Sequence, residues 1–216
     1  MHWFAGVAGR EGKEWGSTSP PRWSMVSKAM AVAYEPHRFP ITRTEYEELV
    51  RRGAFEDARV ELLYGRIVSM SPIRGPHRYS VARLARILME ALTEERARID
   101  VQSSFAAPDE SEPEPDVLVV PPGDYLDAPP RQAWLVVEVA DSSLARDRAK
   151  ARLYGAAGVP EFWIVNLIDW VVEVHLEPRG DGYESVTRHG PGDVLRLASL
   201  EDVEVSVADV LPPRQR

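Results

Sequence analysis

Two apolar segments on either side of a helical segment constrain the fold of this chain most. Residues 133–139 and 161–167 are almost wholly apolar, as is typical of strands covered on both faces of a sheet. Residues 143–155 between them predict a short helix. Because a crossover helix brings the chain back to the end of the sheet at which the first strand began, the two strands are expected to pair in parallel. The pattern therefore predicts an α/β fold with a central mixed sheet flanked by helices.

The segment before this unit predicts a helix and a hairpin. Thr42 and Glu45 have the spacing of a capping box, which opens a helix that ends at Gly53. Residues 58–63 and 66–70 predict two strands joined by a tight turn. The other expected elements are a long helix from Pro76 to about Ile99, strands at 99–103 and 116–120, a loop at 108–115, a hairpin at 170–176 and 183–188, and a short strand with a helical turn within 203–211.

Composition divides the chain into one domain and two tails. Residues 1–38 contain scattered Gly and Pro without helical or strand periodicity, and we interpret them as a flexible N-terminal tail. Part of this tail is not native if translation starts at Met25 or Met30, which is a hypothesis that mass spectrometry can test. Residues 39–212 are expected to form a single domain, with 213–216 as a short C-terminal tail.

Composition also excludes several classes of protein. The chain has no cysteine, which removes disulfides, thiolate catalysis and cysteine-based zinc sites. No apolar run approaches the roughly 20 residues of a membrane-spanning helix, and the first residues lack the pattern of a signal peptide, so we expect a cytoplasmic protein. The net charge of -8 argues against a protein that coats nucleic acid through its overall field, although it leaves room for a local basic groove.

Two carboxylates stand out from the strands that carry them. Glu138 interrupts the apolar run of residues 135–139, where a charge is costly unless it is paired or bound to a metal. Asp116 follows Pro115 at the start of the next strand upstream. Each has a simpler interpretation, since Glu138 can reach solvent at a strand end or pair with a core arginine, and Pro-Asp often marks only a turn. Together, at the ends of neighbouring strands, they supply the hard oxygen ligands that Mg²⁺ prefers.

Lys150 is the third candidate, because lysine is rare in this chain. The sequence has 26 Lys+Arg, of which three are lysines, and the other two lie within residues 1–38. GC-rich coding explains the general bias toward arginine but not this exception. Arg146, Lys150 and Tyr154 are spaced four residues apart, so they form one stripe along the expected helix. Its ammonium would orient a water or stabilise charge on a phosphate. The simpler interpretation is a solvated helix face with an Asp147–Lys150 pair.

In these segments the chain resembles the PD-(D/E)xK nuclease superfamily and, more narrowly, the bacterial Uma-type family of restriction-endonuclease-like proteins. The resemblance spans about Ile41 to Leu197. It is carried by the segments 60–66, 113–120, 135–139, 147–154 and 158–165. The superfamily pattern places its lysine two residues after the second acid, where this chain has Ala140. In the Uma-type group the lysine lies on the following helix, which matches Lys150.

The resemblance implies a restriction-endonuclease-like fold and an endonuclease that cleaves DNA with Mg²⁺, or with Mn²⁺ in its place. Asp116 and Glu138 would hold the metal and Lys150 would assist the reaction. The resemblance also points to Glu61 as a further ligand or orienting acid, although a solvent-facing strand residue is an equal alternative. His77 is a lesser catalytic candidate, because it shares a helix face with apolar residues and a lone inward histidine is more often structural.

Nucleic-acid contacts would come from arginines that flank the proposed site in sequence. The candidates are Arg74, Arg78, Arg146, Arg148 and Arg152. For any one of them alone, a solvated helix face is the simpler interpretation.

Two further expectations concern partners. The resemblance is the main support for a homodimer, with the apolar residues Trp170, Val171 and Val172 as the expected contact. The second functional hypothesis is a non-catalytic, nuclease-like module that acts in binding or assembly. That hypothesis predicts that Lys150 faces solvent or that the two acids point apart.

Overall fold

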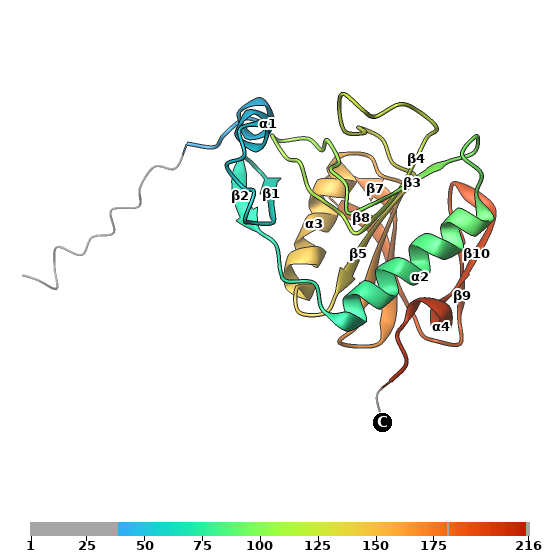
Figure 1. Cartoon of the computed structure of the whole chain (residues 1–216). Coiled ribbons are helices and arrows are strands. Elements are labelled where there is room, and N and C mark those ends of the chain that lie inside the picture. Colours follow the sequence, from blue (N-terminus) through green and yellow to red (C-terminus); the bar gives the residue numbers. More distant parts are fainter. Residues whose placement is uncertain (1–38, 181, 215–216) are drawn as a thin grey trace, which may run out of the picture. The chain divides into compact units, whose positions relative to one another are not determined.

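A six-stranded mixed sheet forms the centre of the fold (Figure 1). The computed structural model describes residues 39–180 and 182–214. Its elements are α1 (Arg43–Arg51), β1 (Val60–Leu63), β2 (Arg66–Ser69), α2 (Gly75–Ala91), β3 (Arg98–Val101), β4 (Val117–Val120), β5 (Leu135–Ala140), α3 (Leu144–Ala156), β6 (Glu161–Asn166), β7 (Val171–Arg179), β8 (Gly182–His189), β9 (Val194–Leu197), β10 (Leu200–Ser206) and α4 (Val207–Val210). The sheet order is β3-β4-β5-β6-β7-β8. β5 and β6 pair in parallel, which confirms the predicted α/β class and strand–helix–strand unit.

Alternation along the strands builds a hydrophobic core on each face of the sheet. Leu88 of α2 packs in a cluster with Val137, whereas Leu153 of α3 packs in a second cluster with Val136. Because successive strand residues point to opposite faces, the two helices cover opposite sides, as Figure 1 shows. Glu138 lies two residues after Val136 and therefore faces α3. The sheet thus directs the acid toward the helix that carries the lysine.

The N-terminal helix and hairpin form as predicted. Thr42 accepts a hydrogen bond from the Glu45 amide, and the Glu45 carboxylate accepts one from the Thr42 amide at 2.7 Å, which completes the capping box. Tyr64 and Gly65 both have positive φ, as a two-residue hairpin turn requires. Backbone hydrogen bonds of 3.2 and 2.7 Å tie Leu62 to the loop that precedes β4. This tether fixes Glu61 of β1 beside the central sheet.

The structure corrects two boundaries. The helix expected to reach Ile99 ends at Ala91, because Leu92 is extended and Arg98 already pairs with β4. The helical spacing of apolar residues stops after Leu92. The chain therefore leaves the helix and pairs with β4 as the edge strand β3. The C-terminal region holds the β9–β10 hairpin before α4, whereas we expected one strand within 203–211. Residues 1–38, which are the expected N-terminal tail, lie outside the described residues. So do residues 215–216, which are part of the expected C-terminal tail. Among the described residues, no helix has the length and apolar character needed to cross a bilayer.

The expected dimer contact is partly used inside the chain. Val172 is 1% exposed and belongs to the core cluster on the α2 side of the sheet. Trp170 packs against the same cluster and is half-buried. A homodimer stays a prediction, and the side chain of Val172 does not supply its surface.

Gly155 gives a prediction about packing between α3 and β8. A Cβ atom at this position would lie 2.3 Å from the carbonyl oxygen of Gly182. Gly155→Ala is therefore expected to lower the free energy of unfolding by roughly 1–3 kcal/mol, although alanine is the better helix former by about 1 kcal/mol. Urea unfolding measures the change. Gly75→Ala in the first turn of α2 is the matched control, since a Cβ there meets open space. Equal stability of both variants would contradict the close packing.

Candidate active site

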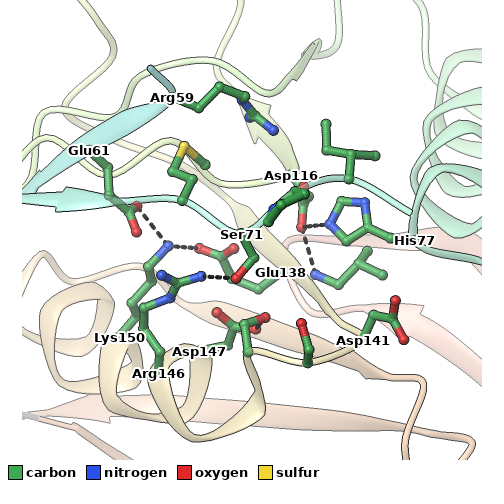
Figure 2. Close-up of a pocket in the computed structure, with 16 residues that line it drawn as sticks. Arg59, Glu61, Ser71, His77, Asp116, Glu138, Asp141, Arg146, Asp147 and Lys150 are labelled. Carbon is green, nitrogen blue, oxygen red and sulfur yellow. Dashed lines mark hydrogen bonds and ion pairs between the residues drawn. The ribbon is translucent and has the colours of Figure 1, made fainter. Parts of the chain in front are cut away.

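Asp116 and Glu138 lie on neighbouring inner strands of the central sheet, Asp116 just before β4 and Glu138 within β5. β4 and β5 are antiparallel with Val117 opposite Val137, so the next step of this register places Asp116 opposite Glu138. Cross-strand neighbours of this kind have Cβ atoms about 4.5–5.5 Å apart. The Val139 amide donates a hydrogen bond of 2.8 Å to Asp116 Oδ2, which fixes the carboxylate against β5. Figure 2 shows both acids beside the same pocket, as the sequence predicted.

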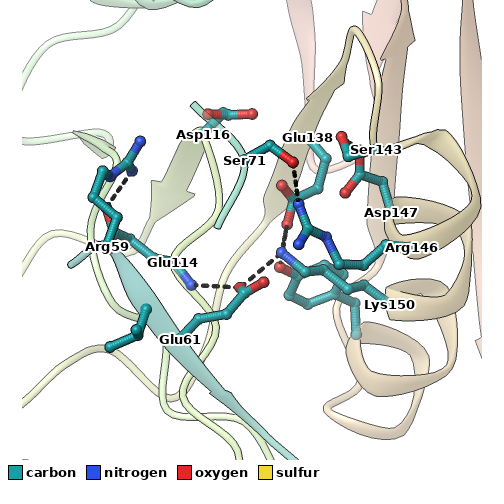
Figure 3. A network of polar contacts seen from close by, with 12 residues as sticks. Arg59, Glu61, Ser71, Glu114, Asp116, Glu138, Ser143, Arg146, Asp147 and Lys150 are labelled. Carbon is teal, nitrogen blue, oxygen red and sulfur yellow. Dashed lines mark hydrogen bonds and ion pairs between the residues drawn. The ribbon is translucent and has the colours of Figure 1, made fainter. Parts of the chain in front are cut away.

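Lys150 lies between two carboxylates. Its Nζ is 2.9 Å from Glu138 Oε1 and 2.8 Å from Glu61 Oε2, and the residue is 4% exposed (Figure 3). One turn further along α3, Tyr154 donates a hydrogen bond of 2.7 Å to the same Glu138 oxygen. The helix stripe of Arg146, Lys150 and Tyr154, which are spaced four residues apart, therefore points into the site. The solvated-face interpretation of Lys150 is wrong, and so is the solvent-facing interpretation of Glu61, which is 1% exposed.

His77 approaches Asp116 from the first turn of α2. Its Nε2 is 3.0 Å from Asp116 Oδ2, so the predicted inward orientation is confirmed. Because the carboxylate accepts, Nε2 donates, and Nδ1 of a neutral ring is then an acceptor. Nδ1 is buried and has no hydrogen-bond partner in the structure. Asp116 is thus held by β5 on one side and by α2 on the other.

A small polar pocket joins these groups. It has a volume of about 40 Å³, and Glu61, His77, Asp116, Glu138 and Lys150 all line it. Its other charged and hydroxyl-bearing lining residues are Arg59, Ser71, Asp141, Ser142, Ser143, Arg146 and Asp147. Most of these escaped the sequence analysis, because the loops that carry them lack a periodic pattern. For Asp147 the signal was its place on the Lys150 helix, where it accepts a hydrogen bond from the Ser143 hydroxyl.

The charges in this pocket perturb one another. The pKa of Glu138 is raised from 4.5 to about 8, chiefly by burial; the Lys150 ammonium opposes the rise, and nearby Asp147, Asp116 and Glu61 add to it. Burial alone would lower the pKa of Lys150, but Glu138 and Glu61 more than offset it and raise the pKa above its ordinary value. Lys150 is therefore an ammonium at neutral pH. Without a bound metal ion, Glu138 favours its protonated form.

The predicted arginines separate into two groups. Arg146 enters the site, where it donates hydrogen bonds to the Ser69 carbonyl at 2.9 Å and to Ser71 Oγ at 3.0 Å. Its buried Nε has no hydrogen-bond partner in the structure. Arg74 and Arg78 are exposed where α2 begins.

The remaining two arginines of α3 lie away from the pocket. Arg148 donates two hydrogen bonds to Glu173 of β7, at 2.9 and 2.6 Å. Arg152 is exposed and, like Arg148, lies two residues from Lys150, which is about 200° around the helix. The geometry therefore gives neither guanidinium a place in the pocket.

The donor set suits a hard cation held by few protein ligands. Among residues 39–180 and 182–214, no group of three or more His, Asp and Glu side chains has the arrangement of a complete metal cage. Mg²⁺ keeps several waters and commonly uses only one or two carboxylates, which Asp116 and Glu138 can supply. Glu61 adds a buried carboxylate oxygen, Oε1, that has no hydrogen-bond partner in the structure. The residues present therefore fit Mg²⁺ or Mn²⁺ as a site shared with water and substrate oxygens.

Comparisons with known proteins point to one family. The model of the Uma2 family, described as "Putative restriction endonuclease", matches residues 43–208. A crystal structure from Anabaena variabilis, described as that of "a putative nuclease", superposes with a TM-score of 0.63 at 14% sequence identity. The match covers 79% of this chain and 97% of the other, and at this identity it supports the fold alone. A search of curated proteins finds no match.

Proposed function

The chain belongs to the Uma2 family of nuclease-fold proteins, and from this premise we propose that it is a Mg²⁺-dependent endonuclease that hydrolyses phosphodiester bonds of DNA at the Asp116–Glu138–Lys150 site. One observation carries the proposal. The Lys150 ammonium is buried within 2.9 Å of Glu138, and Asp116 lines the same pocket. The non-catalytic alternative predicts a lysine in solvent or two acids that point apart, whereas Lys150 is buried and both acids line one pocket.

Each residue has a role in this reaction. Asp116 and Glu138 would hold Mg²⁺ or Mn²⁺, which when bound polarises the scissile phosphate and lowers the pKa of the attacking water. Lys150 donates hydrogen bonds to two acids, which leaves its third proton for a water or a phosphate oxygen. Glu61 keeps this ammonium charged. His77 orients Asp116 through the Nε2 contact.

Arg146 adds positive charge to the pocket. Glu61, Asp116 and Glu138 outnumber the single ammonium, and a phosphodiester would add further negative charge. A guanidinium held by Ser69 and Ser71 at the pocket wall offsets part of it. Planar guanidinium donors suit phosphate oxygens, so Arg146 is the arginine that we assign to the scissile phosphate.

The test is nicking of a supercoiled plasmid. We expect nicking with Mg²⁺ or Mn²⁺ and none in EDTA, because two carboxylates alone do not polarise a phosphate. Asp116→Asn is expected to lower the rate by about 10³-fold, from the several kcal/mol that a metal contributes. Asp209→Asn, which changes an exposed aspartate on α4, is the matched control. Nicking that persists in EDTA or in Asp116→Asn would falsify the proposal.

A further inference from the structure

An apolar groove lies beside the candidate active site. It has a volume of about 760 Å³ and is lined by Pro76 and Tyr79 of α2, by Ile168 and Trp170 of the turn between β6 and β7, and by Arg214. Tyr79 is 39% exposed and Ile168 is 57% exposed, so both present apolar surface to solvent. We call this feature the Tyr79 groove.

The sizes of the two cavities assign them different tasks. The active-site pocket of about 40 Å³ has room for a cation or a few waters, since one water needs at least about 10–15 Å³. A nucleotide does not fit there, and only its phosphate can reach the pocket. The Tyr79 groove is within the range of about 300–1,000 Å³ that is typical of small-molecule sites. Binding of the bases therefore has to occur outside the pocket, and this groove is large enough.

The first turn of α2 separates the two cavities. Ile73 and His77 line the pocket, whereas Gly75, Pro76 and Tyr79 line the groove. An α-helix with its side chains is roughly 10–12 Å across. Stacked nucleotides advance about 3.4 Å each along a strand, so about three nucleotides span this turn. A strand whose phosphate lies at Asp116 and Glu138 can thus place a neighbouring base in the groove.

The aromatic rings and guanidinium groups of the groove suit the flat bases and the negatively charged phosphates of a nucleic-acid strand. The Arg214 guanidinium lies 5.5 Å from the centre of the Trp170 ring in a cation–π contact. Arg74 and Arg78 are exposed where the strand would cross α2. The nearby acid Asp169 is paired with Arg188. Aromatic rings that alternate with arginines are the platform on which unpaired bases stack while cations follow the backbone.

The turn beneath the groove is ordered by its own hydrogen bonds. Asn166 Oδ1 accepts from the amides of Ile168 and Asp169 at 3.0 and 2.9 Å. The Trp170 amide donates to the Asn166 carbonyl at 2.8 Å, and Trp170 adopts a positive φ of 63°. The indole is therefore positioned before any ligand arrives, which lowers the entropy cost of binding.

We propose that the Tyr79 groove binds one or more unpaired bases of the strand that is cut, so that the substrate is single-stranded or locally unpaired DNA. The inference rests on the proposed nuclease function for its geometry. The ring faces of a base are open for stacking on a side chain only when the base has left the duplex. A fully paired duplex can offer its phosphates to the site but no base to Tyr79.

Binding is measured without divalent metal, by fluorescence anisotropy of a labelled 12-nucleotide single strand and of the matching duplex. The wild-type chain is expected to bind the single strand at least about tenfold more tightly. Tyr79→Ala is expected to weaken single-strand binding by about 5- to 150-fold, the loss typical of one stacked base, and to leave duplex binding unchanged. Tyr79→Phe keeps the ring and the affinity. Arg214→Ala provides a second variant, and Met89→Ala, an exposed apolar change at the far end of α2, is the matched control.

Plasmid nicking in parallel separates this inference from the proposed function. Equal binding of both DNAs, or Tyr79→Ala without effect, overturns the groove inference even where metal-dependent nicking persists. Tyr79-dependent single-strand binding with no metal-dependent cleavage of either the plasmid or the single strand supports the groove and removes the catalytic proposal. A Tyr79→Ala variant that dissociates a dimer and leaves DNA binding intact identifies the groove as a subunit contact and also overturns the inference.

Discussion

Lys150→Met is expected to abolish DNA cleavage and to lower the free energy of unfolding by about 3–5 kcal/mol at neutral pH, the usual cost of breaking a buried ion pair. Methionine keeps the aliphatic stem of the lysine, so the change removes charge more than volume. Glu61, 2.8 Å from the ammonium and 1% exposed, is left as a buried carboxylate without a cation. It must take up a proton or remain charged in the interior, and both outcomes are unfavourable.

The companion variant is Lys150→Met with Glu61→Gln. Removing both charges leaves no isolated ion, and replacing a whole buried ion pair with uncharged side chains of similar volume is often neutral or stabilising. We therefore expect the double variant to recover most of the lost stability and none of the cleavage. Urea unfolding at pH 7 and plasmid nicking measure the two effects. A single variant that unfolds like the wild type would show that the lysine is not held as an ion pair, and one that still nicks DNA would remove Lys150 from the mechanism.

The central part of this site could be predicted because its residues stand out from their local sequence and are energetically unfavourable without partners. A glutamate within an apolar strand and a lone lysine on the next helix need partners, and the structure supplies them by pairing Glu138 with Lys150. The strand–helix–strand unit then requires β5 and α3 to be neighbours. Sequence reasoning therefore reached the contact between these two residues, the family resemblance added Glu61, and helical spacing indicated that His77 points inward.

The rest of the site could not be predicted because it depends on the paths of loops. Ser71 reaches the pocket from the segment between β2 and α2, and Arg59 lies just before β1. Neither position has a periodicity that states which way its side chain points. The β9 strand was missed for a related reason, since its burial alternates over only four residues. Short edge elements depend on tertiary pairing more than on their own pattern.

Glu138→Gln is expected to separate catalysis from stability. Cleavage should fall by about 10³-fold or more, because an amide is a poor ligand for Mg²⁺. Stability should be retained, since glutamine has the shape of the protonated acid and its carbonyl can still accept from Lys150 and Tyr154. Burial raises the pKa of Glu138 to about 8, so the wild-type site already favours the neutral form. At neutral pH the catalytic acid is thus held in a protonated state that a bound cation reverses.

The sign of the pH dependence follows from this shift. The unfolded chain releases the Glu138 proton near 4.5, whereas the folded chain holds it to about 8. The folded state binds more protons within this window, so the contribution of Glu138 to stability falls as pH rises from 4.5 to 8. Glutamine does not titrate. The variant should therefore match the wild type near pH 4 and become the more stable protein, by on the order of 4 kcal/mol, near pH 8.

Calorimetry of Mg²⁺ binding gives an independent readout that needs no DNA. A carboxylate must lose its proton to bind a metal, so at pH 7 the wild-type chain is expected to release close to one proton per Mg²⁺, and at pH 9 very little. Titrations in two buffers with different ionisation enthalpies measure this number. Glu138→Gln should bind Mg²⁺ more weakly and release almost no proton, while Glu90→Gln on the exposed face of α2 behaves as the wild type. Equal proton release from the Glu138→Gln variant and the wild type would show that another group carries the proton, and Glu138 would then lose its place as the titrating metal ligand.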